Sequence, residues 1–440
     1  MMQPWFTNAK LGIFVHWGSY AVGRRGSESW PVAWGHVPYD QYRSEMDGFT
    51  AEAYDPKAWA DLFKRAGARY AVLTTKHHDG FTLWPTAEDS PSLSEKLGGR
   101  DLVGPFVDAV REVGLKTGLY FSHTDWSNLP HVGALTGLSE AEIAQRRAEK
   151  SNWRSLMEQG RPEQVGARAR WADFLKLHRA QLRELLTQYH PVDLIWFDVH
   201  WGGERFGYDF PELRNFLHEL NPQIVINSRM MGHGDYDTPE QFIPVYAPEG
   251  PWELCLTTND TWSFTGREDH YKTPFEMVAM FCECLGMGGN LLLNVGPDER
   301  GIIPAEQVAM LETLGAWVQL HEEAVYGTQR GLPVGFSYNF TSFNPARDVL
   351  YVYLSHLPPA DGGGTAIKGI RNKIKSATLL HSGQACSWKR IGGAPWLNVP
   401  GTLWVDVPRD DLHPLVSVLK LELDGPIDMY NGYGVEIDQN

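Results

Sequence analysis

Short apolar runs alternate with segments of helical periodicity from the N-terminus to about residue 323, and this alternation restricts the fold more than any other feature of the chain. Apolar side chains recur every three or four residues at Trp59, Leu62, Phe63 and Ala66, the pattern of a helix that covers a sheet. The alternation predicts parallel strands joined by crossover helices, as in a (β/α)8-type TIM-like barrel. The expected strands are Leu11–His16, Tyr70–Lys76, Thr117–Ser122, Leu194–Asp198, Ile224–Asn227 and Asn290–Val295, with two more near Phe242–Tyr246 and Glu253–Leu256.

The C-terminal part of the chain has a different pattern. Its strands alternate apolar and polar residues and are separated by proline and glycine clusters, which is typical of an antiparallel β-sandwich. We predict a catalytic barrel over residues 1–330 and a sandwich over residues 331–440, with the boundary near Gly327–Pro333. The charged segment 125–170 is too long for an ordinary connection and is expected to be an elaborated loop. The expected sandwich strands are Val349–Leu354, Ala377–His381, Leu403–Val407 and Val416–Leu423.

Charge and composition exclude several classes of protein. The formal net charge of −15 argues against a nucleic-acid partner, since phosphate binding needs basic patches. No apolar run approaches the roughly 20 residues that cross a bilayer, so no membrane partner is expected. The first residues lack the basic head and apolar stretch of a secretory signal, which favours a cytoplasmic protein. A chain already trimmed of its signal, secreted or periplasmic, would look the same.

Polar side chains close several of the expected strands, at the end of the barrel where reactive groups gather. Asp198 is the clearest case, because it ends the apolar run Leu194–Phe197 and has Trp196 and Trp201 beside it. A carboxylate on a rigid strand end between aromatic walls suits the nucleophile of a glycosidase. A helix cap or a loop salt bridge is the alternative.

A retaining glycosidase needs a second carboxyl group about 5 Å from the nucleophile, partly desolvated so that it carries a proton. We take Glu253 as the candidate acid/base. Glu249 is the rival and Glu28 the third choice, and any of the three could be an ordinary surface glutamate.

Several histidines, His16, His77, His78, His123 and His200, could be read as a metal cluster. However, no strand carries a His-x-His pair, and neither a His-Glu-x-x-His nor a Cys-x-x-Cys motif occurs. Neutral imidazoles that bond sugar hydroxyls explain these residues without a metal, so no metal site is expected. Any single one of them could also be a core histidine with its hydrogen bonds satisfied within the protein.

Five strings occur in an order that closely resembles the α-L-fucosidases of glycoside hydrolase family 29: GIFVHWG (12–18), KHHDGFTLW (76–84), IWFD (195–198), WELCLTTNDTW (252–262) and GNLLLNVGP (289–297). The resemblance extends from about Trp5 to Gly327, and Val416–Gly425 resembles the end of the family's C-terminal sandwich. It implies a retaining exo-hydrolase that removes terminal α-linked L-fucose from a fucosylated oligosaccharide or glycoconjugate through a covalent glycosyl-enzyme intermediate. It also implies that no metal or organic cofactor takes part.

By position in these strings, Asp198 matches the family's nucleophile, and the match of Trp252-Glu253 supports Glu253 as the acid/base. Trp84 or Trp262 is expected to pack on the C5 methyl of fucose. The family's fucose pocket corresponds to His16, His77, His78, Trp84, Tyr120, Trp196 and Arg229.

The chain departs from many relatives at Glu28-Ser29-Trp30. Two other functions stay open. One is hydrolysis of a related sugar such as an α-galactoside, and the other is a catalytically silent protein that binds fucose or another glycan. The sequence is also compatible with a homo-oligomer.

Overall fold

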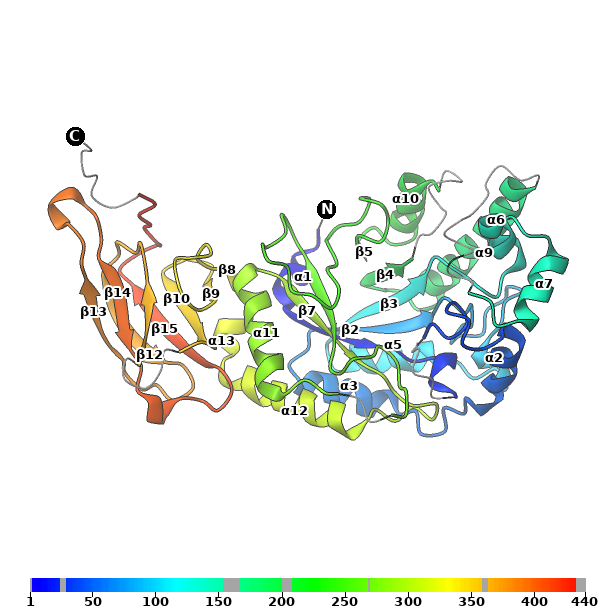
Figure 1. Cartoon of the computed structure of the whole chain (residues 1–440), viewed down its shortest axis with the longest axis horizontal. Helices are drawn as coiled ribbons and strands as arrows, with labels where there is room; N and C mark the ends of the chain where they lie inside the picture. The colour runs from blue at the N-terminus through cyan, green and yellow to red at the C-terminus, as the bar shows by residue number, and fades with distance from the viewer. Residues whose placement is uncertain are drawn as a thin grey trace.

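The computed structural model describes residues 2–23, 29–152, 155, 166–199, 208–267, 270–357 and 363–432. The chain forms two parts side by side, an N-terminal curled parallel sheet surrounded by helices and a smaller C-terminal part made of antiparallel sheets (Figure 1). The two architectures confirm the predicted fold class.

The N-terminal sheet has seven parallel strands in the order β5-β4-β3-β2-β1-β7-β6. Nearly every residue in these strands is buried, because the strands are covered on both faces. This explains why they appear in the sequence as continuous apolar runs. Their bounds are Leu11–Val15 (β1), Tyr70–Lys76 (β2), Lys116–Ser122 (β3), Leu194–Asp198 (β4), Val225–Ile226 (β5), Glu253–Thr257 (β6) and Asn290–Val295 (β7).

The edge strands β5 and β6 are connected by the segment Tyr236–Glu240, which lies between them. Tyr236 forms a parallel bridge with Asn227 beyond β5, and Glu240 forms one with Cys255 in β6. The segment therefore takes the place of an eighth strand. The strand expected near Phe242–Tyr246 is wrong: the aromatic residues of that segment are exposed, and the pairing residues lie just before it.

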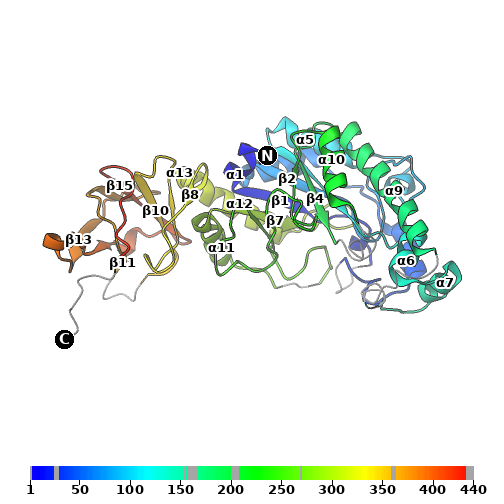
Figure 2. The same cartoon turned by 90° about the horizontal axis from the view of Figure 1, so that it is seen from above.

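Helices cover the outside of the curled sheet (Figure 2). The helix α3 begins where Asp55 accepts a hydrogen bond from the backbone N–H of Ala58, and α5 begins where Asp101 accepts from the N–H of Val103 over 2.8 Å. The main helices are Pro56–Arg65 (α3), Val103–Glu112 (α5), Ala167–Gln188 (α9), Phe210–Leu220 (α10), Pro274–Met287 (α11) and Ala305–Leu320 (α12). Shorter ones are Pro4–Ala9 (α1), Tyr39–Glu45 (α2), Leu93–Lys96 (α4) and Glu322–Val325 (α13).

The elaborated loop expected over residues 125–170 contains two helices, Leu129–Thr136 (α6) and Glu140–Ala148 (α7). Ser139 and Glu142 form a capping box at the start of α7. Arg170 in α9 donates to the carbonyl of Gly133 over 3.0 Å and ties α6 to the long helix. Most residues of α6 are buried, on all its sides, whereas in α7 only Ile143 is. Neither helix therefore has an apolar stripe, which is why the segment looks weakly periodic in the sequence.

The C-terminal part consists of a five-stranded antiparallel sheet, in the order β12-β15-β10-β9-β8, and a three-stranded one, β11-β14-β13. Leu350, Leu403 and Leu421 belong to one buried cluster formed by both sheets. The change of architecture lies between the end of α13 and the start of β8. The bounds are Gln329–Arg330 (β8), Thr341–Phe343 (β9), Val349–Leu354 (β10), Gly364–Ile367 (β11), Ile374–Leu379 (β12), Ser387–Ile391 (β13), Thr402–Asp406 (β14) and Ser417–Leu423 (β15).

Candidate active site

A cavity of about 300 Å³ opens at the carboxyl end of the barrel strands. Asp198 ends β4 and lies in its wall, together with side chains from β1 and β3 and from segments that follow other strands of the sheet. Its lining residues in the described part of the chain are Phe14, His16, Ser29, Trp30, His77, Tyr120, Trp196, Asp198, Val199, Arg229, Glu240 and Trp262.

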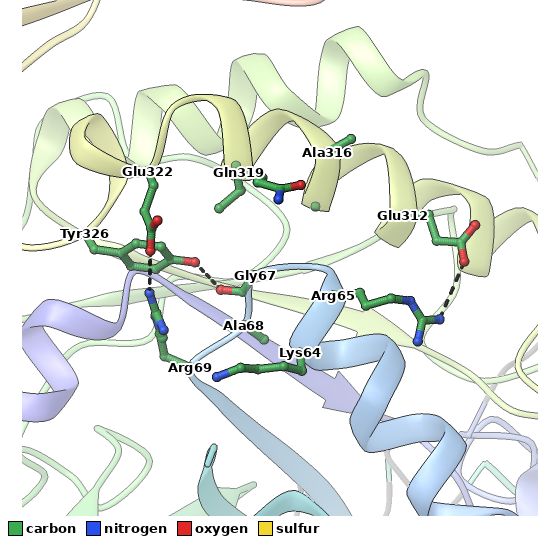
Figure 3. A pocket seen from close by; sticks show the side chains of 12 residues that line it. Lys64, Arg65, Gly67, Ala68, Arg69, Glu312, Ala316, Gln319, Glu322 and Tyr326 are labelled. Atoms are coloured by element: carbon green, nitrogen blue, oxygen red, sulfur yellow. Dashed lines mark hydrogen bonds and ion pairs between the residues drawn. The ribbon is translucent and has the colours of Figure 1, made fainter. Parts of the chain in front are cut away.

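A larger cavity, of about 620 Å³, lies elsewhere, between α3 and α12 (Figure 3). Four of its charged side chains form ion pairs across the groove, Arg65 with Glu312 at 3.6 Å and Arg69 with Glu322 at 3.2 Å. None of the residues predicted from the strand ends lines this groove. We therefore place the candidate site at the smaller cavity.

The carboxylate of Asp198 is held by three donors. Its Oδ1 accepts from the N–H of Val199 over 2.9 Å and from Nη1 of Arg229 over 3.1 Å, and its Oδ2 accepts from the hydroxyl of Tyr120 over 3.0 Å. Val199 has a φ of 47°, which is strained for a β-branched residue. Burial, followed by the charge of Asp198, raises the pKa of Tyr120 well above its ordinary value, so this hydroxyl stays a donor.

Arg229 connects Asp198 to a second carboxylate. Its Nη2 donates to Oε2 of Glu240 over 2.7 Å. Burial alone would lower the pKa of the guanidinium, but the charges of Asp198 and Glu240 raise it above its ordinary value. In the described lining, Glu240 is the one carboxyl group besides Asp198, and its side chain is 41% exposed.

Burial favours the neutral form of three histidines near Asp198, His16, His77 and His78. Burial lowers the pKa of His16 and His78 to about 3 and that of His77 well below its ordinary value. Nδ1 of His16 lies 2.8 Å from Oδ1 of Asn294, and Nε2 of His78 lies 3.6 Å from Oδ2 of Asp198. Nδ1 of His77 is buried and has no hydrogen-bond partner among the described residues.

Aromatic rings form the floor and one wall of the cavity. Trp196 is stacked on Tyr120, with 5.6 Å between ring centroids and 17° between planes, and it contacts Phe14 at 5.0 Å. Trp262 packs against His16 at 5.1 Å. Such flat apolar faces suit the C–H faces of a sugar ring.

Most of the predicted site residues meet in this cavity. His78 contacts Asp198 without being part of the lining, and Trp84 is elsewhere: its indole is fully buried and donates to Glu184 in α9 over 2.8 Å. The expectation that Trp84 lines the pocket is therefore wrong. Glu249 lines a separate shallow depression, and Glu28, His200 and Trp201 lie outside the described residues. The predicted residues that line the cavity are His16, His77, Tyr120, Trp196, Asp198, Arg229 and Trp262.

Glu253 does not reach the cavity, which argues against the acid/base role expected for it. It is the first residue of β6 and pairs with Asn290, the first residue of β7, so it lies at the amino end of the barrel. Its side chain is 0% exposed, and its carboxyl accepts from Trp196 over 2.9 Å, from Tyr236 over 3.2 Å and from Tyr70. No leaving group can reach a carboxyl enclosed in this way.

The cavity also contains residues that the strand-end criterion missed. Glu240 follows no apolar run, and only the bridge to Cys255 brings it to the carboxyl end of the barrel. Ser29 and Trp30 come from the segment after β1 that departs from the expected family pattern. Their sequence carries no spacing signal that would have found them.

In the part of the chain that the structure describes, no group of three or more histidine, cysteine, aspartate or glutamate side chains is arranged to hold a metal ion. The described helices include none long and apolar enough to cross a membrane.

Comparisons with known proteins agree on one family. The family model described as Alpha-L-fucosidase matches residues 1–323. Tissue alpha-L-fucosidase of Rattus norvegicus is 31% identical over 357 residues, which cover 74% of this chain and 70% of that protein. The human tissue alpha-L-fucosidase is 30% identical over 357 residues, with the same coverage of both chains.

Solved structures give the same result over nearly the whole chain. Alpha-L-fucosidase isoenzyme 1 from Paenibacillus thiaminolyticus has a TM-score of 0.79 and 30% identity, and covers 96% of this chain and 98% of its own. A GH29 alpha-L-fucosidase from Bacteroides thetaiotaomicron, trapped as a covalent intermediate with 2-fluoro-fucosyl fluoride, has a TM-score of 0.78 and 25% identity, with 95% of each chain covered.

Proposed function

The chain belongs to the α-L-fucosidase family, and we propose that it hydrolyses terminal α-linked L-fucose with retention, with Asp198 as nucleophile and Glu240 as acid/base. The observation that carries this assignment is the guanidinium of Arg229, which bonds both carboxylates in one cavity. The substrate is a fucosylated oligosaccharide or glycoconjugate.

In the first step, an oxygen of Asp198 attacks the anomeric carbon, and the bond from that carbon to the glycosidic oxygen breaks. Glu240 donates its proton to the departing oxygen. Three hydrogen-bond donors hold the Asp198 carboxylate in one orientation. This reduces the reorganisation needed to reach the transition state. The products of this step are the free leaving group and a fucosyl ester on Asp198.

In the second step, Glu240 accepts a proton from water, and the water oxygen attacks the anomeric carbon. The ester bond to Asp198 breaks, so fucose leaves with its original configuration. A glycan bound over Glu240 removes water from a side chain that is 41% exposed in the free protein.

The cavity volume of about 300 Å³ suits a single sugar ring. Trp262 supplies an apolar wall for the C5 methyl of fucose, since Trp84 does not line the cavity. The neutral imidazoles of His16 and His77 can donate to or accept from sugar hydroxyls.

The proposal is tested by incubating the protein with an aryl α-L-fucoside and an aryl α-galactoside. Proton NMR of the first sugar released from the fucoside should show the α-anomer before mutarotation. Faster release from the galactoside would contradict the assigned sugar, and an initial β-anomer would contradict retention. Fucose binding without hydrolysis would indicate a silent binding protein.

A further inference from the structure

Glu253 occupies an unusual place for an ionisable side chain. Its carboxyl lies inside the barrel, below the floor of the cavity, and is completely buried. Three aromatic donors from three separate segments converge on it: the indole N–H of Trp196 and the hydroxyls of Tyr70 and Tyr236. These three hydrogen bonds explain why a carboxyl group is buried at this place. The explanation needs no role for Glu253 in proton transfer to the leaving group.

The hydrogen bond from Trp196 determines how its indole lies. Trp196 is in the middle of β4, only 2% exposed, and its N–H points away from the cavity towards Oε1 of Glu253 at 2.9 Å. An apolar residue in place of Glu253 would leave this N–H and two hydroxyls without an acceptor. A buried donor without a partner destabilises its conformation.

The ring of the same indole contacts two donors of the proposed catalytic carboxylates. The guanidinium carbon of Arg229 lies 5.3 Å from the Trp196 ring centroid, and Tyr120 is stacked on that ring. Arg229 and Tyr120 both donate to Asp198, and Arg229 also donates to Glu240. A tilt of the Trp196 ring would therefore move the donors of both carboxylates.

We propose that Glu253 is a positioning residue, which fixes the indole of Trp196 and, through it, the donors that aim Asp198 and Glu240. The inference depends on the function proposed above, because it concerns the aim of those two carboxylates. It predicts that the loss of the acceptor at Glu253 reduces the rate of the chemical step more than the affinity for the sugar.

The test compares kcat and KM for an aryl α-L-fucoside in three variants, alongside their thermal unfolding. Glu253→Met removes the acceptor, and Glu253→Gln keeps an oxygen for Trp196. Asn290→Ala is the matched control, because Asn290 pairs with Glu253 across β6 and β7 and its buried amide bonds only the backbone of Lys10 and Phe6.

We expect Glu253→Met to lower kcat about tenfold or more and to change KM less than threefold. Glu253→Gln should retain most of kcat, and Asn290→Ala should unfold at lower temperature with kcat unchanged. In a Trp196→Phe background, which lacks the indole N–H, Glu253→Met should have no further effect on kcat. If Glu253→Met does not fold, Trp196→Phe is the alternative variant, because it removes the donor of the same hydrogen bond instead of the acceptor.

The inference would be overturned if Glu253→Met had the kcat of the wild type. It would also be overturned if Glu253→Met lowered kcat by the same factor in the Trp196→Phe background as in the wild type. An inactive wild-type protein would contradict the proposed function instead. In that case the indole N–H proton resonance of Trp196 still tests the hydrogen bond: we expect it to move upfield in Glu253→Met, and an unchanged resonance would overturn the inference.

Discussion

Asp198 and Glu240 share a single guanidinium: Arg229 donates Nη1 to Asp198 over 3.1 Å and Nη2 to Glu240 over 2.7 Å. The two carboxylates come from different parts of the barrel, the end of β4 and the segment between β5 and β6. A planar fork with fixed donor directions can hold both at once, whereas an ammonium group is a single point charge. The relative position of the two carboxylates therefore depends on Arg229.

Arg229→Lys should lower kcat about 100-fold, because lysine keeps the positive charge but cannot bond both carboxylates in the same directions. Initial rates on an aryl α-L-fucoside measure this effect. Arg214→Lys is the matched control, since Arg214 pairs with Asp235 outside the cavity and its replacement should leave kcat unchanged. An active Arg229→Lys enzyme would show that the shared guanidinium is dispensable.

Tyr120→Phe should lower kcat about tenfold, since it removes one of the three donors to Asp198 and keeps the ring stacked on Trp196. The thermal unfolding temperature should change little, because the two side chains have nearly the same shape. Steady-state kinetics and a melting curve on the same preparation separate the two effects. A large loss of stability with normal kinetics would contradict the role of the hydroxyl.

Trp262→Ala should reduce the preference for the α-L-fucoside over the α-galactoside about tenfold in kcat/KM, because the wall against the C5 methyl is lost. Trp84→Phe should leave this ratio unchanged and lower the melting temperature, since the indole of Trp84 bonds Glu184 in the core. The opposite result, in which Trp84 controls the ratio, would place the sugar elsewhere.

The stability of the protein should depend on pH through Glu253. Burial raises the pKa of this carboxyl from its ordinary value of 4.5 to about 7. The folded protein then keeps a proton that the unfolded chain loses, so the contribution to stability is complete below pH 4.5 and is lost as the pH rises through 7.

Glu253→Gln removes this dependence. The free energy of unfolding of the wild type relative to that of the variant should fall by about 3 kcal/mol between pH 4.5 and pH 8. Urea unfolding of both proteins at the two pH values measures the change. A difference that is independent of pH would show that Glu253 titrates normally.

The sequence predicts the buried parallel strands well, because burial on both faces leaves continuous apolar runs. The bounds of Tyr70–Lys76, Leu194–Asp198 and Asn290–Val295 are those expected. The segment Tyr236–Glu240 could not be predicted in this way, since it pairs through isolated bridges and has no run of its own. The helices within residues 125–170 were missed for a similar reason, their weak periodicity.

Dependence on apolar runs also explains why the sequence pointed to Glu253 and missed Glu240. A strand-end criterion finds Asp198, which closes an apolar run, but Glu253 stands before such a run, at Leu254–Leu256, and lies at the opposite end of the barrel. Glu240 lacks any neighbouring pattern, and its place in the cavity follows only from tertiary contacts. Spacing along the chain could therefore not identify Glu240 as a candidate.

The most direct test of the account is azide rescue of Glu240→Ala and Glu253→Gln with an aryl α-L-fucoside that has a good leaving group. A small anion can attack the fucosyl ester when the residue that activates water is missing. We predict that azide accelerates Glu240→Ala and yields α-L-fucosyl azide, whereas Glu253→Gln keeps most of its activity and gains nothing from azide. Rescue of Glu253→Gln, with Glu240→Ala as active as the wild type, would contradict the account and return the acid/base to Glu253.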